Sequence, residues 1–344
     1  MVKKFLYASL GLAPVAIGIS FAGTGGLVIF TVAAAALLPL AWLIGESTEQ
    51  AAYHTGPGIG GFLNATFGNA PELIIALFAV SHGLTDVVRG SLAGSVVGNM
   101  LLVLGFSLAV GGRGQLDRRS SFVSIGLVAV TALVLLIPAG PGWSGDPDRA
   151  ALAALSLPVA VVLLLAYMAV TSFALRRHHD LHRGTAANER AWPLHVSLSV
   201  LAIATVITAW VAEILVGSIE EFAEHAGLSE FFVAAVIIAI VGNAAEHGGA
   251  VVVAAHGKLK LAAEIALASS AQVAVFLIPA VAILSWAIDP LALSFRPVEI
   301  AVMGGTAAFC SVVLFGGHSS RGRGILLLAG YAAVAAAFFI VGDR

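Results

Sequence analysis

The stretch Gly61–Val80, GFLNATFGNAPELIIALFAV, decides the class of fold. It is apolar enough to cross a bilayer, yet it carries Asn69 and Glu72 on one face of the expected helix. A carboxylate at membrane depth is costly and therefore marks a functional site by default. Pro71 cannot donate a backbone hydrogen bond and crowds the carbonyl of Phe67, so we expect a kink that frees this carbonyl. An acid, an amide and a carbonyl on one turn are ligands for a hard cation.

The same turn occurs a second time in IVGNAAEHGGA, where Asn243 and Glu246 repeat the spacing of Asn69 and Glu72. Each copy is followed by another membrane segment with polar residues, which are Ser95 and Asn99 in the first half and Ser269, Ser270 and Gln272 in the second. Two related polar half-sites within membrane segments indicate a transporter built from repeats, with its site at the bilayer midplane.

The composition is that of a membrane protein. Hydrophobic residues make up 59% of the 344 residues and charged residues only 10%, which excludes a soluble domain. The apolar runs are continuous rather than alternating, which argues against a β-barrel. Cys310 is the only cysteine, so an intrachain disulfide and a cysteine metal cage are excluded. We expect an all-α polytopic membrane protein with the lipid bilayer as partner, and neither nucleic acid nor a cofactor.

The apolar spans define the organisation of the chain. The pattern predicts about 11 transmembrane helices, at roughly 5–21, 26–44, 59–81, 87–110, 120–139, 150–175, 194–217, 230–254, 262–287, 296–316 and 323–342. We interpret the first span as a retained helix within residues 1–25 rather than a signal peptide. Residues 26–175 and 194–344 then form two five-helix repeats around a cytoplasmic linker, 176–193. Five helices are an odd number, so the second repeat is inverted relative to the first.

Basic residues predict the orientation. The side that holds the N-terminus has 13 of them: Lys3, Lys4, Arg113, Arg118, Arg119, Arg176, Arg177, Arg183, Arg190, Lys258, Lys260, Arg321 and Arg323. The other side has 4: Arg89, Arg149, Arg296 and Arg344. By the positive-inside rule the N-terminus is cytoplasmic and the C-terminus lies outside, in what we expect to be a bacterial plasma membrane.

The segments GFLNATFGNAPELI, GSVVGNMLLVLG, IVGNAAEHGGA and SSAQVAVFLIP together resemble the Ca²⁺/H⁺ antiporters of the cation exchanger family. The resemblance covers about Gly45 to Pro279. It implies 11 helices and an alternating-access site between two repeats, with Ca²⁺ and H⁺ as substrates. It also implies cation-binding acids at Glu72 and Glu246. The neighbouring polar ligands that it implies are Asn69, Asn243, Ser95, Asn99, Ser269 and Gln272. Sodium/calcium exchangers of the same superfamily show Thr-Ser in place of Gly68-Asn69, which argues against sodium coupling.

Charge balance at the two acids suggests exchange. Two buried carboxylates are tolerated only when a divalent cation bridges them or each takes a proton, so one ion displaces the other. Oxygen ligands favour Ca²⁺ over soft transition metals. Exchange of Mn²⁺ or Na⁺ against protons stays open, as does a cation channel.

An intramembrane enzyme is not expected, because the chain has no H-E-x-x-H motif and no Asp pair within its spans. The sequence does not predict the oligomeric state.

Four further residues are candidates for an accessory proton path. Glu46 and Glu220 are each 26 residues before a site glutamate, so each falls near one mouth; both are equally explained as interfacial carboxylates. Glu213 lies inside a predicted span and is either a proton relay or an acid that reaches the interface. His247 follows Glu246 and either shuttles protons or packs against another helix.

Overall fold

A computed structural model of the chain describes residues 2–178 and 192–342, without the side chains of residues 2–4, 56–62, 64–65, 172–178 and 245–247. These residues are mainly helical, with one two-residue antiparallel ladder between β1 (Gly114–Gln115) and β2 (His318–Ser319). Within them, 7 helices are long and apolar enough to cross a membrane, or 8 with one bent pair counted as a single span. The count of 11 stays a prediction, because other predicted spans correspond to shorter apolar helices such as Ala70–Ser81 and Pro297–Val313.

The helices follow one another with short connections. The first half contains α1 (Val2–Ser9), α2 (Leu12–Phe21), α3 (Gly26–Phe67), α4 (Ala70–Ser81), α5 (Thr85–Val97), the π-helical turn η1 (Gly98–Val103), α6 (Leu104–Gly111), α7 (Arg118–Ala139), the 3-10 turn η2 (Gly140–Trp143) and α8 (Ala150–His178). The second half contains α9 (Leu194–Gly217), α10 (Ile219–Ala226), α11 (Glu230–Phe232), the π-helical turns η3 (Val233–Ile238) and η4 (Val273–Leu277), α12 (Ala239–Gly242), α13 (Ala244–Ala255), α14 (Leu259–Gln272), α15 (Ile278–Leu284), the 3-10 turn η5 (Ser285–Ala287), α16 (Pro297–Val313) and α17 (Arg321–Val341).

The helix α3 is longer than expected. The sequence predicts separate spans at 26–44 and 59–81, but α3 continues unbroken for 42 residues. The polar residues after residue 44 bond within the helix and so do not end it: Gln50 donates to Glu46 at 3.2 Å, and Thr48 donates to the Ile44 carbonyl at 2.7 Å. Bonds of this kind, from a side chain to the preceding turn, give the polar groups partners inside the helix.

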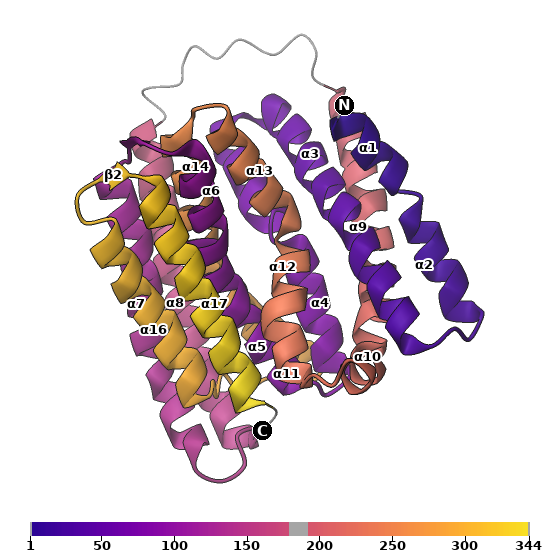
Figure 1. Cartoon of the computed structure of the whole chain (residues 1–344). Helices are drawn as coiled ribbons and strands as arrows, with labels where there is room; N and C mark the ends of the chain where they lie inside the picture. Colours follow the sequence, from indigo (N-terminus) through magenta and orange to yellow (C-terminus); the bar gives the residue numbers. More distant parts are fainter. Residues whose placement is uncertain (1, 179–191, 343–344) are drawn as a thin grey trace.

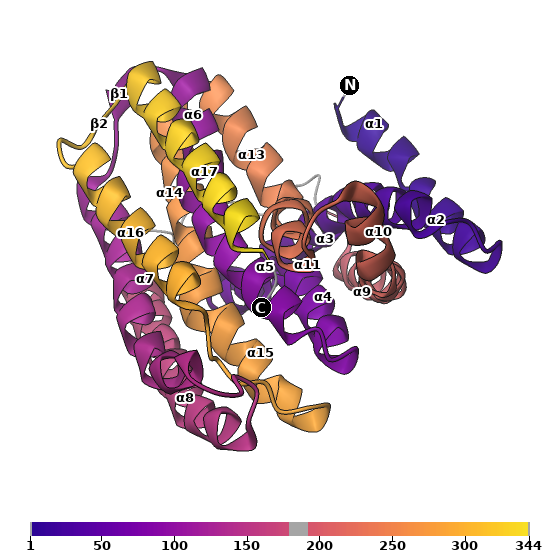
Figure 2. The same cartoon turned by 60° about the horizontal axis from the view of Figure 1, so that its bottom comes forward.

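Helices α3 and α9 form a layer beside the rest of the bundle, with α2 packed against both. Figures 1 and 2 show this layer on the right-hand side of the bundle, with α1 and α2 outside it. Trp192, just before α9, ties the two helices together: its N–H donates to Gln50 Oε1 at 3.0 Å, and its carbonyl lies 2.6 Å from His54 Nε2. Residues 179–191 of the predicted linker lie outside the described part of the chain.

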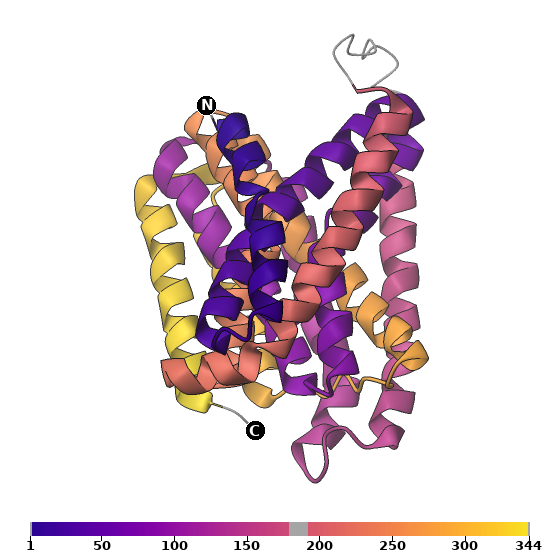
Figure 3. The same cartoon turned by 90° about the vertical axis from the view of Figure 1, so that its right-hand side faces the viewer.

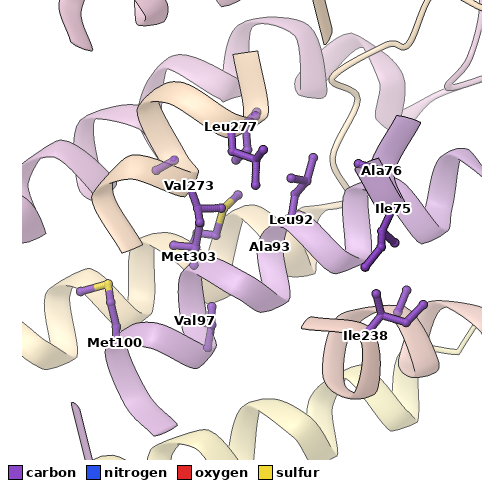
Figure 4. Packing of buried hydrophobic residues seen from close by; sticks show 14 of the residues in the cluster. Ile75, Ala76, Leu92, Ala93, Val97, Met100, Ile238, Val273, Leu277 and Met303 are labelled. Carbon is purple, nitrogen blue, oxygen red and sulfur yellow. The ribbon is translucent and has the colours of Figure 1, made fainter. Parts of the chain in front are cut away.

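The centre of the bundle is made by the two spans that carry the predicted polar residues. In the apolar 18-residue windows of Thr85–Gly111 and Leu259–Ala287, 78% and 72% of the residues are buried, whereas in that of Arg321–Val341 only 17% are. The packing here is close: a Cβ on Gly94 would lie 1.9 Å from the Ala235 carbonyl oxygen, so only glycine lets α5 meet η3. Figure 4 shows the apolar side chains around α5, with Leu92 beside Ile75 and Ile238 on one side and Leu277 on the other.

Charged residues hold one end of the bundle together. Arg89 is 1% exposed and pairs with Asp86 at 2.8 Å and Asp148 at 2.7 Å. Arg296 also pairs with Asp86, at 3.0 Å. Arg89, counted in the sequence among the basic residues of the outer side, joins α5 to the α7–α8 connection and, through the Ala292 carbonyl, to the segment before α16. This end is opposite to the start of α1, as Figure 3 shows.

Candidate cation site

Both copies of the Asn-x-x-Glu turn interrupt a helix. Asn69 lies between α3 and α4 with φ −99° and ψ 14°, and Pro71 falls in the first turn of α4, so the predicted kink is a complete break. Asn243 lies between α12 and α13 with φ −89° and ψ 6°. The second break occurs without a proline. Interrupted membrane helices leave backbone carbonyls for ligand binding, as is typical of transporter sites.

Four of the predicted polar residues form one hydrogen-bonded chain that joins the two halves. Asn243 Nδ2 donates to Ser95 Oγ at 2.8 Å. Asn99 Nδ2 donates to Asn243 Oδ1 and to Ser269 Oγ, both at 3.0 Å. All four side chains are buried. The structure thus brings these four side chains together, and each amide fixes the orientation of the next. Their role as cation ligands stays a prediction.

Glu72 lies at the edge of this network. Its side chain is 8% exposed and packs over Gly242 of the second half, where a Cβ would lie 2.9 Å from Glu72 Cγ. A small, partly open hollow of about 10 Å³ adjoins it, lined by Glu72, Ser91 and Ser95 together with four apolar residues. Asn69 is also buried. The first carboxylate thus reaches across to the second Gly-Asn turn.

Irregular helix turns accompany the polar residues. Asn99 lies in η1, and Gln272 ends α14 immediately before η4. A π-helical turn inserts an extra residue into a helix, rotates the face that follows, and occurs frequently at functional sites. Gln272 itself is half-buried.

The remaining predicted residues lie apart or outside the description. The side chains of Glu246 and His247 lie outside the described residues, although their backbone belongs to α13. Glu46 is half-buried and accepts from Gln50. Glu213 on α9 and Glu220 on α10 are exposed, so the structure does not bring them into the network. Their roles stay predictions.

The sequence analysis missed one contributor, Ser91, and named a second, Ser270, only as a polar residue of its segment. Ser91 lines the hollow beside Glu72, one helical turn before Ser95. The sequence signal for it is the i, i+4 spacing, which places both hydroxyls on one face of α5. Ser270 donates to the Val96 carbonyl at 2.8 Å and so binds α14 to α5. This hydrogen bond joins the two halves of the chain, so the sequence of one segment alone could not predict it.

The donor set is one of oxygens. Among the described residues, no three His, Cys, Asp or Glu side chains gather in one place. The network instead offers one buried carboxylate together with amide and hydroxyl oxygens. Such ligands suit a hard cation, and a carboxylate that is buried in this way needs a cation or a proton for neutrality.

Known proteins resemble this chain over most of its length. The chain is 35% identical to the Ca²⁺/H⁺ antiporter of Synechocystis sp. over 98% of this chain and 97% of the relative. It is 36% identical to the Ca²⁺/H⁺ antiporter ChaA of Bacillus subtilis over 91% and 92%. The solved structure of native YfkE superposes with a TM-score of 0.83 at 32% identity, over 97% of this chain and 99% of that one. The sodium/calcium exchanger protein family matches residues 25–176 and 196–340, and the chain belongs to this family.

Proposed function

We propose that the chain is a secondary transporter that exchanges cytoplasmic Ca²⁺ for external protons by alternating access. The observation that carries the proposal is the buried Glu72 carboxylate, packed on Gly242 beside an amide–hydroxyl network from both halves. The names of the relatives from Synechocystis sp. and Bacillus subtilis point to the same pair of ions.

In this proposal, Glu72 and Glu246 bind either Ca²⁺ or protons. Ca²⁺ neutralises both carboxylates at once, and two protons do the same, so each ion excludes the other. Oxygen atoms of the neighbouring side chains complete the Ca²⁺ shell. These are Asn69, Asn243, Ser95, Asn99, Ser269 and Gln272. Glu46, Glu213, Glu220 and His247 remain candidates for moving protons between the site and the two surfaces.

The proposed movement is that of the α3–α9 layer against the rest of the bundle. These two helices begin the two proposed inverted repeats, at residues 26–175 and 194–344. The two helices pack most extensively on each other, with α2 and α4 beside them, while the ion pairs of Arg89 hold the opposite part together. A layer with its own packing can tilt as a body, which opens the site to one side at a time.

Orientation sets the direction of transport. With 13 basic residues on the side of the N-terminus and 4 on the other, the N-terminus is proposed to be cytoplasmic, in a bacterial plasma membrane. A cell with an inward proton gradient would then expel Ca²⁺. A reporter fused to the C-terminus tests the orientation: activity outside the cytoplasm supports it, and activity inside overturns it.

Ca²⁺ uptake into everted vesicles, with and without a pH gradient, tests the function. Uptake should need the gradient and should vanish in both Glu72→Gln and Glu246→Gln while the protein still inserts. Near-normal transport in either variant would remove that residue from the site. Conduction without a proton gradient would indicate a channel, and uptake of Mn²⁺ or Na⁺ but not Ca²⁺ would indicate another exchanger.

A further inference from the structure

The hollow beside Glu72 is built to hold one small polar molecule. Its volume of about 10 Å³ is close to the least that a water molecule needs. Its polar lining comes from Glu72, Ser91 and Ser95, while Ile75, Leu92, Ile238 and Ala239 supply the apolar remainder. A buried water needs two to four polar partners, and these three side chains can provide them.

The two hydroxyls offer complementary hydrogen-bonding groups. Ser91 Oγ donates to the Val88 carbonyl at 3.0 Å, so its oxygen is left to accept a further hydrogen bond. Ser95 Oγ accepts from Asn243 Nδ2 at 2.8 Å, and its own O–H can still donate. A water in the hollow can therefore donate to Ser91, accept from Ser95 and exchange a proton with Glu72. The apolar walls leave it few other orientations.

Among the described residues, the polar lining of the hollow extends toward the face of the membrane where α5 begins. Ser91 lies one turn nearer than Ser95 to Thr85, where α5 begins, at the end of the bundle that holds Arg89. In the second half Ser269 has the same distance from Glu246 as Ser95 has from Glu72, 23 residues. Four residues before Ser269 the chain has the apolar Ile265. The residue one helical turn before the serine at this spacing is therefore polar in the first half, where it is Ser91, and apolar in the second, where it is Ile265.

We infer that Glu72 exchanges its proton with the face of the membrane where α5 begins, through a water that Ser91 positions. This inference rests on the proposed antiport. A proton that arrives from that face protonates the water, and the water passes one of its protons to the Glu72 carboxylate, so one proton is transferred and the water is restored. Ser91 acts on the proton step as a positioning residue and is not a Ca²⁺ ligand.

Ser91→Ala separates the proton step from Ca²⁺ binding. Two reactions are measured in vesicles of one orientation: Ca²⁺ exchange driven by a pH gradient, and exchange of labelled for unlabelled Ca²⁺ without a gradient. The proton-driven rate should fall by about tenfold, the loss expected for one hydrogen-bonding partner. The Ca²⁺–Ca²⁺ exchange should stay within about twofold of wild type. Ser91→Thr keeps the hydroxyl and should restore the proton-driven rate.

Ser107→Ala is the matched control, because Ser107 is a fully buried serine on α6 that does not line the hollow. It should leave both rates unchanged. An equal loss of both rates in Ser91→Ala, or no loss of either, would overturn the inference. If Ser91→Ala inserts poorly, Ser91→Cys replaces it, with the same two rates and the same criteria. Absence of both reactions in the wild-type protein would overturn the proposed antiport itself, and this inference with it.

Discussion

Glu72 lies directly over Gly242, so the carboxylate of the first half rests on the Gly-Asn turn of the second. A Cβ at Gly242 would be 2.9 Å from Glu72 Cγ, which is too close for both to keep their places. Because the atom in the way belongs to a flexible side chain, we expect Gly242→Ala to fold but to displace the carboxylate. Transport should fall by at least about tenfold, the effect of 1.4 kcal/mol at the site.

Gly248→Ala is the control for this prediction, since a Cβ at Gly248 meets nothing within 4 Å. Ca²⁺ transport by purified, reconstituted protein is the measurement. Equal activity of Gly242→Ala and wild type would mean that the position of Glu72 does not matter for exchange.

A second glycine should matter for folding rather than for transport chemistry. A Cβ at Gly94 would lie 1.9 Å from the Ala235 carbonyl oxygen, whereas at Gly98, one turn further along, it meets nothing within 4 Å. Backbone cannot move aside cheaply, so Gly94→Ala should lose about 1–3 kcal/mol or more of stability. Gly98→Ala should be tolerated. Thermal unfolding followed by size-exclusion chromatography in detergent compares the two, and equal melting temperatures would argue against close packing of α5 and η3.

Much of the site could be predicted from the sequence because its signals are local. Polar residues in apolar spans are conspicuous, and two copies of one turn tie distant segments together. The break at Asn69 followed from Pro71, a residue that cannot continue the hydrogen-bond ladder. The hydrogen bond between Asn99 and Asn243 was not predicted, because the sequence shows polar residues in each half but not which of them face one another.

Other features depended on contacts that no local pattern contains. The helix break at Asn243 could not be predicted, because no proline follows it in the sequence IVGNAAEHGGA. The continuity of α3 depends on polar side chains that form hydrogen bonds within their own helix. A hydropathy profile does not contain this information. Arg89 carries the same charge as a surface arginine, and its ion pairs with Asp86 and Asp148, together with its hydrogen bond to the Ala292 carbonyl, make burial possible. Ser91 resembles any small residue of a packed helix until its neighbour Glu72 is known.

Coupling should be about two protons for each Ca²⁺, which makes transport electroneutral, because the Ca²⁺-loaded and doubly protonated sites carry the same charge. A third exchanging acid would make transport electrogenic. Glu213 is the candidate, but its side chain on α9 is exposed and away from the network. Ca²⁺ flux in proteoliposomes under clamped voltage should therefore be insensitive to voltage. A steep voltage response that disappears in Glu213→Gln would make Glu213 the third proton carrier.

Proton release on Ca²⁺ binding tests the central claim most directly, because it needs neither a membrane nor a gradient. Purified protein in weakly buffered detergent, at a pH where the site is protonated, is titrated with Ca²⁺ while the pH is recorded. The account predicts release of about two protons per bound Ca²⁺ from the wild-type protein and from the exposed-surface control Glu224→Gln, and at most about one from Glu72→Gln. Ca²⁺ binding to the wild-type protein without proton release would contradict competition of the two ions for one site.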